Sequence, residues 1–304
     1  MKYKRLGRSG EKIPAIGIGT WKLGRNPGDD MKAIRMGVSL GMRFIDTAEM
    51  YGTEELVGKA IKGEQGIFIA TKVSPHHFGH DDLIRACDES LKNLGIKTID
   101  LYQLHWPNEQ VPIAETMGAM EELVKAGKIR HIGVCNFSAR ELQAAREALK
   151  DNDIVSDQIE YSVFVRDPIE DVGPYCAKEG ITVIAYSPLA RGMMFESERH
   201  KALAKLNDIG AKYGRTAAQV ALGWLLSKEG VVAIPKAASI AHMRENAQAV
   251  DLKLGTKDLA AIDAMDNSGI RSISSRMNQF TRKTTSLWSN LMQKRERLRV
   301  KHGI

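Results

Sequence analysis

Short apolar runs and longer mixed stretches alternate along the chain. The runs are almost continuously apolar rather than alternating, which is typical of parallel strands that are covered on their outer face. Each run is short enough to be a strand and is bounded by polar or turn-forming residues. The eight expected strands are Ile16–Thr20, Phe44–Asp46, Ile67–Lys72, Ile99–Leu104, Ile129–Val134, Ile154–Ile159, Thr182–Tyr186 and Val231–Ile234.

The mixed stretches between these runs are expected to be helices. One of them starts at Ser138 with Glu141 three residues later, which is the signature of a capping box. Gly127 and Gly180 mark the ends of two others. The expected helices are Asp30–Leu40, Glu54–Ile61, Asp81–Leu94, Ile113–Ala126, Ser138–Leu149, Ile169–Glu179, His200–Lys212, Thr216–Ser227 and Ile240–Val250.

Eight strand–helix units without a break in composition predict an α/β fold, a (β/α)8 TIM barrel, as one domain over residues 1–270. Tyr3–Leu6 and Lys12–Pro14 flank a turn cluster, so we expect a small β-hairpin before the barrel. A doubly wound sheet is the alternative. The dinucleotide fingerprint of that fold is missing, because Gly17-Ile18-Gly19 has no third glycine in the required place.

The bulk composition is that of an ordinary globular protein. The chain has 304 residues, of which 43% are hydrophobic and 27% charged. Cys87, Cys135 and Cys176 are scattered, which favours reduced thiols in the cytoplasm. We find no signal segment and no run of about 18 apolar residues, so we expect no membrane association, and we expect no metal site.

The net charge of +7 comes from the end of the chain. From Arg271 onward there are nine Lys or Arg residues and one acid, which leaves residues 1–270 close to neutral. We expect residues 271–304 to form an extension with a basic helix at Ser286–Val300. It would pack on the barrel, or else line the substrate pocket or a subunit contact. Binding of nucleic acid or membrane has the least support, and a monomer and a homo-oligomer both remain open.

Polar residues stand at the carboxyl end of nearly every expected strand. In a barrel these ends converge on one mouth, where the chemistry is found. Taken singly each residue has an ordinary explanation, such as a solvated strand end or a turn residue. The set is Asp46, Tyr51, Lys72, His105, Asn136, Gln158, Tyr186, Ser187 and Lys236.

Four of these residues together suggest proton delivery. A buried Lys72 ammonium close to Tyr51 would stabilise tyrosinate and lower the phenol pKa from about 10. Asp46 would keep Lys72 charged, and a neutral His105 would orient a carbonyl. Such a set suits a general acid that protonates a developing alkoxide.

The motifs around these residues resemble those of the aldo-keto reductase family over about residues 3–265. The resemblance rests on motifs that occur in the family's order: Gly17-Ile18-Gly19-Thr20-Trp21, Asp46-Thr47-Ala48 with Tyr51-Gly52, Thr71-Lys72, Asp100-Leu101-Tyr102 with His105-Trp106-Pro107, Gly127 to Phe137, Gln158 with Tyr161, Ala185 to Leu189, and Ile234-Pro235-Lys236.

This resemblance implies an NAD(P)H-dependent carbonyl reductase with Asp46, Tyr51, Lys72 and His105 as its catalytic tetrad. Tyr51 would be the general acid for small carbonyl substrates. Trp21 and Trp106 would wall the substrate pocket together with Tyr51 and His105. The cofactor would contact Gly19, Thr20, Trp21, Asp46, Asn136, Gln158, Tyr186, Ser187, Leu189, Arg191, Ile234, Lys236, Ser239, His242, Glu245 and Asn246.

The chain departs from the family pattern at two places. Cys135 replaces the usual serine before Asn136, and His242 replaces an arginine of the segment that binds the adenosine phosphate. Lys236 and Ser239, with His242 or Arg244, would still bind a 2′-phosphate, so we expect NADPH rather than NADH. A non-catalytic redox sensor that binds the nucleotide is the alternative function. The physiological substrate cannot be deduced from the sequence.

Overall fold

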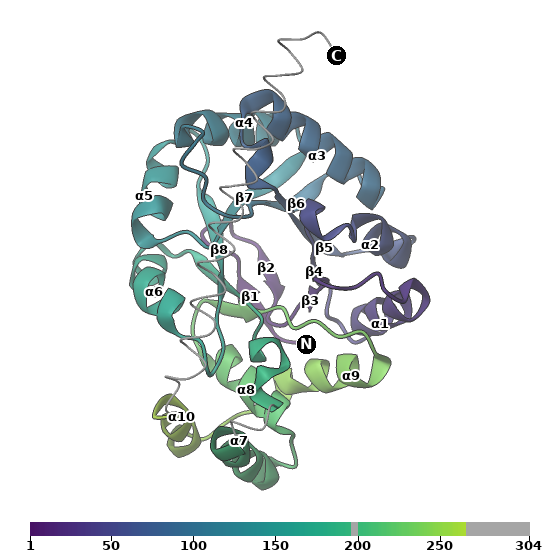
Figure 1. The fold of residues 1–304 in the computed structure, drawn as a ribbon, viewed down its shortest axis with the longest axis vertical. Coiled ribbons are helices and arrows are strands. Elements are labelled where there is room, and N and C mark those ends of the chain that lie inside the picture. Colours follow the sequence, from purple (N-terminus) through teal and green to yellow (C-terminus); the bar gives the residue numbers. More distant parts are fainter. Residues whose placement is uncertain (196–199, 266–304) are drawn as a thin grey trace.

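The computed structural model describes residues 1–195 and 200–265 of the chain. Eight parallel strands form one sheet in sequence order, curled into a barrel with helices around it (Figure 1). The predicted fold class is therefore confirmed. The strands are β3 (Ile18–Gly19), β4 (Phe44–Asp46), β5 (Phe68–Val73), β6 (Ile99–Leu104), β7 (Ile129–Cys135), β8 (Ile154–Glu160), β9 (Thr182–Tyr186) and β10 (Val231–Ala233).

Short backbone contacts join the first and last strands. Parallel bridges pair Ile16 with Ala233 and Gly19 with Lys236. The approach is too close for larger residues. A Cβ on Gly19 would lie 2.6 Å from the Ile234 oxygen, and one on Gly17 would lie 2.6 Å from the Phe44 ring. Gly19 therefore allows the close approach that closes the barrel, and Gly17 leaves room for Phe44, which explains a Gly-x-Gly sequence outside a dinucleotide fingerprint.

Ten α-helices occur in the described part of the chain. Ser138 forms the expected capping box with Glu141, and Thr216 forms another with Gln219. The helices are α1 (Pro27–Ser39), α2 (Glu54–Ile61), α3 (His80–Leu94), α4 (Ile113–Lys125), α5 (Ala139–Glu147), α6 (Asp167–Glu179), α7 (His200–Tyr213), α8 (Ala217–Ser227), α9 (Ile240–Gln248) and α10 (Thr256–Asp263).

The helix boundaries differ from expectation in a few places. Helix α1 begins three residues early, at Pro27, because a proline fits the first turn of a helix, where its missing N–H is not needed. Helix α10 was not expected, and it is held by Arg166, whose guanidinium donates to the Ile262 and Asp263 oxygens. The expected basic helix at Ser286–Val300 and the whole extension 271–304 lie outside the described residues.

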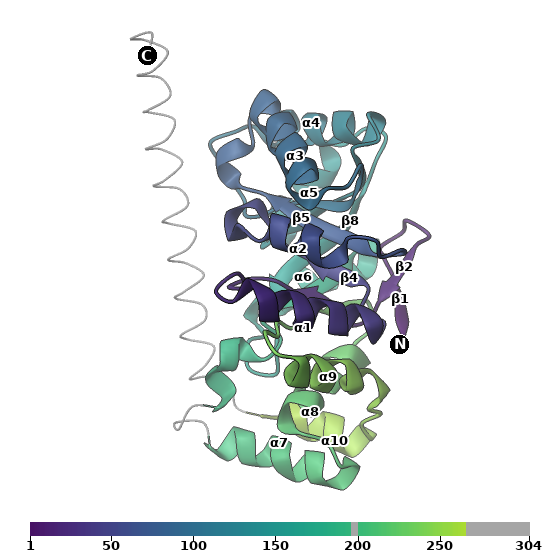
Figure 2. The same ribbon diagram turned by 90° about the vertical axis from the view of Figure 1, so that its right-hand side faces the viewer.

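The predicted N-terminal hairpin, β1 (Tyr3–Arg5) and β2 (Lys12–Pro14), lies at one end of the barrel (Figure 2). Leu6 and Ile13 pack there against inward-facing side chains of the strands. Together they form an apolar layer with Phe44, Ala70, Leu101, Val155, Ile184, Val232 and Ile234. The hairpin thus seals the end of the barrel where the strands begin.

Strand register decides what lies above this apolar layer. Ala70 pairs with Leu101, and two residues further along Lys72 pairs with Gln103. Because alternate residues of a strand face the same side, Lys72 and Gln103 project into the barrel one layer higher. The core of the barrel therefore changes from apolar to polar within two residues of strand.

Lys4 of the hairpin ties the N-terminus to the end of α8. Its Nζ donates to the backbone oxygens of Leu226 at 2.8 Å, Lys228 at 2.7 Å and Val231 at 2.6 Å. These carbonyls extend from the last turn of α8 to the first residue of β10, so a single ammonium group holds the junction together.

We expect Lys4→Met to lower the free energy of unfolding by about 1–3 kcal/mol, because three carbonyl oxygens lose their donor. Urea denaturation measures the loss. Lys2→Met is the matched control, since Lys2 is exposed on the same segment. Equal losses in the two variants would contradict the role given to Lys4.

Candidate active site

Four predicted residues meet at the carboxyl ends of neighbouring strands. Asp46 ends β4, and Lys72 lies near the end of β5. His105 directly follows β6, and Tyr51 ends a short 3₁₀ helix, Glu49–Tyr51, that follows β4. Parallel strands bring these ends together, so four residues far apart in the sequence share one polar layer.

Lys72 is the centre of this cluster and is fully buried. Its Nζ lies 2.6 Å from Asp46 Oδ1, 2.7 Å from the Thr47 backbone oxygen and 3.4 Å from the Tyr51 hydroxyl. An ammonium group has three protons, and the three contacts use all of them. The Tyr51 hydroxyl also lies 3.4 Å from His105 Nε2, so the phenol stands between an ammonium and an imidazole.

The second oxygen of Asp46 accepts two side-chain amides. Gln158 Nε2 donates to Asp46 Oδ2 at 2.7 Å, and Gln103 Nε2 donates to it at 3.2 Å. Gln103 is a residue that the sequence interpretation missed. A signal was present, because Gln103 is a polar residue two positions before His105 in an apolar run, and it therefore faces the same side of the strand.

Buried threonine hydroxyls fix the segment that carries Tyr51. The Thr53 hydroxyl lies 2.9 Å from the Thr47 hydroxyl and 3.1 Å from the Thr20 hydroxyl. The Thr20 hydroxyl in turn donates to the backbone oxygen of Asp46. Gly52 then turns the chain into α2 with a left-handed φ of 64°. Tyr51 is therefore held from both sides of its short 3₁₀ helix.

The pKa of Tyr51 corrects the expectation from sequence. Burial raises this pKa from 10 to about 12, although the nearby Lys72 charge acts in the opposite direction. Burial would lower the pKa of Lys72, but the Asp46 carboxylate outweighs it and keeps that pKa above its usual value. The Lys72 ammonium reduces the rise in the Tyr51 pKa without reversing it, so Tyr51 holds its proton at neutral pH.

His105 is electrically neutral in this environment. Burial, together with the Lys72 charge, holds its pKa well below the usual 6.5. Its Nδ1 atom is buried and has no hydrogen-bond partner among the described residues. A neutral ring of this kind can orient a polar group without adding positive charge beside Lys72.

Asn136 and Tyr186 continue the polar layer on the side of β7 and β9. Asn136 Nδ2 donates to the His105 backbone oxygen at 3.2 Å, and the Tyr186 hydroxyl donates to Asn136 Oδ1 at 2.9 Å. Asn136 has a φ of 62°, a conformation that costs energy for a residue with a side chain. Hydrogen bonds therefore link Asn136 and Tyr186 to His105, and Gln158 to Asp46 in the same polar layer.

The segment after β9 also carries left-handed backbone, at Ser187, Ala190 and Arg191. Arg191 forms an ion pair with Glu160 at 3.2 Å and lies over the Trp21 ring, with 5.6 Å between the guanidinium carbon and the ring centroid. Trp21 is 40% exposed, whereas Trp106 is 9% exposed. Glu160 is a second buried polar residue of the mouth that the sequence interpretation missed.

A second group of predicted residues lies at the start of α9. Lys236, Ser239 and His242 are exposed, and the Ser239 hydroxyl caps the helix by accepting the His242 N–H. Glu245 accepts the Thr216 hydroxyl, and Asn246 is buried. In the described part of the chain, the direct link between this group and the tetrad layer is the backbone bridge between Lys236 and Gly19.

The remaining predicted residues lie in or around the same mouth. The Thr20 hydroxyl donates to the backbone oxygen of Asp46, and the Leu189 backbone oxygen accepts the Gly192 N–H in the segment after β9. Ile234 belongs to the apolar layer beneath the polar one. All three cysteines are buried and unpaired. The described residues contain no cluster suited to a metal ion and no helix long and apolar enough to cross a membrane.

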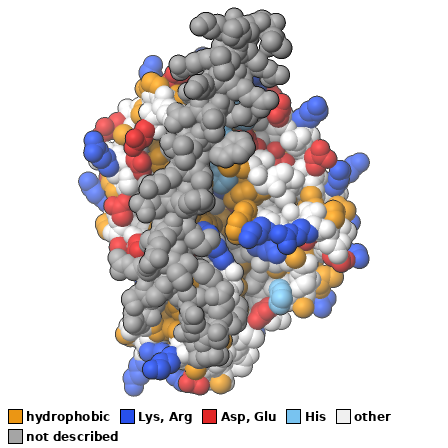
Figure 3. Space-filling view, in the orientation of Figure 1, with side chains coloured by type: hydrophobic (Ala, Val, Ile, Leu, Met, Phe, Trp, Pro, Cys, Tyr) orange, Lys and Arg blue, Asp and Glu red, His pale blue; other side chains and the backbone are white. Residues whose placement is uncertain are grey.

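The face that carries the mouth has both signs of charge. Lys, Arg, Asp and Glu side chains are interspersed around its described part, and hydrophobic side chains lie among them (Figure 3).

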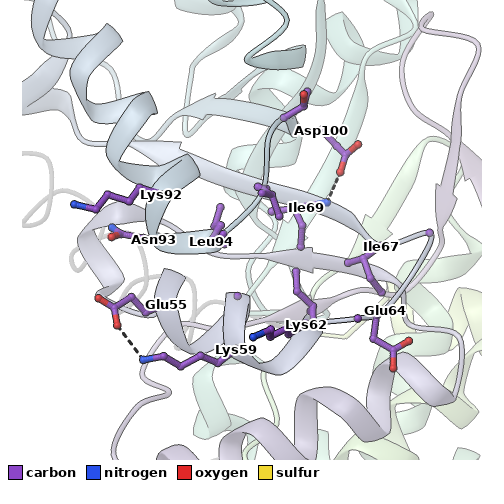
Figure 4. A pocket seen from close by; sticks show the side chains of 17 residues that line it. Glu55, Lys59, Lys62, Glu64, Ile67, Ile69, Lys92, Asn93, Leu94 and Asp100 are labelled. Atoms are coloured by element: carbon purple, nitrogen blue, oxygen red, sulfur yellow. Dashed lines mark hydrogen bonds and ion pairs between the residues drawn. The ribbon is translucent and has the colours of Figure 1, made fainter.

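A separate pocket of about 670 Å³ lies at the opposite end of β5 and β6 (Figure 4). Its lining includes Ile67, Leu94 and Asp100, which lie near strand starts or a helix end. Glu55 is paired with Lys59, and Asp100 accepts the Ile69 N–H. None of Asp46, Tyr51, Lys72 and His105 lines this pocket, so it is separate from the candidate site at the mouth.

We expect the His105 ring to be neutral at pH 6.5, where an ordinary histidine is half protonated, because burial and Lys72 oppose its protonation. Ring C–H chemical shifts in NMR spectra, assigned with a His105→Asn variant, measure this. His77 is an internal contrast, since its hydrogen bond to Glu49 raises its pKa above 6.5. A His105 midpoint at or above 6.5 would contradict the expectation.

Comparison with known proteins places this arrangement in context. Residues 15–267 match the model of the aldo/keto reductase family. Methylglyoxal reductase YeaE of Escherichia coli (strain K12) is 38% identical over 271 residues, which are 86% of this chain and 95% of the relative.

Solved structures agree with this match. Thermostable aldo-keto reductase Tm1743, solved with the inhibitor epalrestat, is 42% identical with a TM-score of 0.82 over 87% of this chain and 99% of that chain. An aldo/keto reductase from Klebsiella pneumoniae, solved with NADP and acetate, is 38% identical with a TM-score of 0.80 over 86% of this chain and 94% of that chain. The protein therefore belongs to the aldo/keto reductase family.

Proposed function

We propose that this protein reduces aldehydes and ketones to alcohols with NADPH, and that Tyr51 is the general acid. The observation that carries the proposal is the position of the Tyr51 hydroxyl, 3.4 Å from both Lys72 Nζ and His105 Nε2. A phenol in this place can give a proton to an oxygen that gains negative charge. The ammonium then stabilises the tyrosinate that is left.

The residues of the mouth fit a nicotinamide dinucleotide. Asn136 and Gln158 present side-chain amides that suit a carboxamide, and the half-buried Tyr186 ring suits stacking. The exposed Lys236 and Ser239 at the start of α9 suit a phosphate. When bound, this cofactor supplies a hydride to the carbonyl carbon.

Within the chain itself, His105 and Tyr51 act on the carbonyl oxygen. His105 orients this oxygen by a hydrogen bond, and Tyr51 transfers its proton to it. Trp21 and Trp106 line the approach. The name of the YeaE relative supports a small dicarbonyl such as methylglyoxal as a first substrate to test.

Tyr51→Phe should lower the turnover of methylglyoxal and 4-nitrobenzaldehyde by about 10²–10⁴-fold, because the proton donor is lost. The dissociation constant of NADPH should change by less than about threefold, since the ring remains. Absorbance at 340 nm and fluorescence quenching measure the two quantities. Tyr3→Phe, in the exposed part of the hairpin, is the control.

Two outcomes would argue against this proposal. Turnover of Tyr51→Phe above a tenth of the unmodified rate would exclude Tyr51 as the main acid. If the unmodified protein binds NADPH but reduces no aldehyde in a broad panel, the redox-sensor function is favoured instead.

NADPH should bind at least about tenfold more tightly than NADH, because Lys236 adds a positive charge where a 2′-phosphate would lie. Lys236→Met should weaken NADPH binding and leave NADH binding unchanged. Lys62→Met, at the opposite end of the barrel, should change neither. Equal affinities of the unmodified protein for the two cofactors would refute the preference.

A further inference from the structure

Asp46 carries two different sets of contacts on its two oxygens. Oδ1 accepts the Lys72 ammonium at 2.6 Å, whereas Oδ2 accepts Gln158 at 2.7 Å and Gln103 at 3.2 Å. The two amides thus hold the carboxylate in an orientation that gives only one oxygen to Lys72.

That orientation matters for Tyr51. Lys72 has three protons, which point to Asp46, to the Thr47 oxygen and to the Tyr51 hydroxyl. If Asp46 rotated to offer both oxygens to Lys72, it would compete with Tyr51 for the third proton. It would also neutralise more of the positive charge that has to stabilise tyrosinate.

Gln103 is placed to prevent this rotation. Its side chain is fully buried, and its Oε1 accepts Gln158 Nε2 at 3.3 Å and the Cys135 thiol at 3.7 Å. The amide is therefore held at both ends. Its N–H group can stay on Asp46 without the help of solvent.

Gln158 has a second task under the function proposed above. Its amide would hold the carboxamide of the cofactor, yet here the same Nε2 atom donates to Asp46 and to Gln103. When Gln158 turns to the carboxamide, Asp46 Oδ2 loses its shorter hydrogen bond. Gln103 then becomes the donor that remains on this oxygen.

We propose that Gln103 is a positioning residue for carbonyl reduction. It fixes Asp46 so that Lys72 keeps one proton directed at Tyr51, including when Gln158 is engaged by the cofactor. This inference rests on the proposed function, and it concerns a residue that acts through Asp46 and Lys72 without touching the substrate.

The first test compares Gln103→Met with the unmodified protein. Methionine has a similar length and no N–H donor, so kcat should fall about 5–20-fold. The KM for methylglyoxal and the dissociation constant of NADPH should stay within about twofold. The solvent deuterium isotope effect on kcat should rise, because proton transfer from Tyr51 becomes slower relative to the other steps.

Thr182→Val is the control for a general loss of stability. Thr182 is also buried, and its hydroxyl accepts the Gly7 N–H and donates to the Arg5 oxygen at the sealed end of the barrel. This variant should lose thermal stability and keep kcat and the isotope effect. If Thr182→Val slows turnover as much as Gln103→Met, the effect is structural and the proposal fails.

Gln103→Glu gives a pH signature that a structural role would not produce. Burial beside Asp46 raises the pKa of the new carboxyl, so at low pH it is a neutral donor to Oδ2. The ratio of the kcat of Gln103→Glu to that of the unmodified protein should be near one at about pH 5.5 and should fall at least fivefold by about pH 9. A ratio that does not change with pH would overturn the proposal.

The two proposals can fail separately. If Tyr51→Phe abolishes reduction while Gln103→Met has an unchanged kcat, the function stands and the role of Gln103 is wrong. If the unmodified protein reduces no carbonyl, the proposed function fails first. In that case the positioning role fails with it.

Discussion

The buried ion pair between Lys72 and Asp46 constrains the rest of the site. Taking two charges out of water costs several kcal/mol for each ion, and the cost is recovered only when every remaining hydrogen-bonding group is matched. Here the match is completed by the Thr47 oxygen, by two glutamine amides and by the Tyr51 hydroxyl. The contact between the Lys72 ammonium and the Tyr51 hydroxyl thus completes the hydrogen bonding of the ammonium group.

The barrel supplies the surroundings that such a pair needs. Below it lies an apolar layer closed by the hairpin residues Leu6 and Ile13, which keeps water out from the end where the strands begin. One layer higher, the register of β5 and β6 sets Lys72 beside Gln103. Asp46 and Lys72 are accordingly buried, with exposed fractions of 2% and 0%.

Most of the fold could be predicted from the sequence, because buried parallel strands consist of short apolar runs that alternate with helices. The meeting of Asp46, Lys72 and His105 at one mouth could be predicted as well, since strand ends converge in a barrel and each of these residues lies at or near the end of such a run. Helix α10 could not, because much of its anchoring comes from Arg166, 90 residues before its first residue Thr256, and no local pattern shows this contact.

The sequence analysis predicts Gln158 as a site residue, but strict alternation along the strand does not account for its inward orientation. Val155 faces the apolar layer, and strict alternation would then place Asp157 inward instead of Gln158. The pairing of β7 with β8 shifts register between Ile132 and Gly133, which brings Gln158 onto the inner face. A shift of this kind is a property of two paired strands, so neither strand reveals it alone.

The direction of the Tyr51 pKa shift also depends on the folded chain, which sets both the burial of the phenol and its distance from Lys72. Lys72 lowers this pKa, but burial acts more strongly and raises it to about 12. The phenol therefore stays protonated at neutral pH. Under the proposed function, its strength as an acid depends on how well Lys72 stabilises the tyrosinate. That stabilisation is greatest when Asp46 keeps Lys72 charged and directs part of its own negative charge toward amide N–H groups. The site is thus tuned by the partners of Asp46 as much as by Lys72 itself.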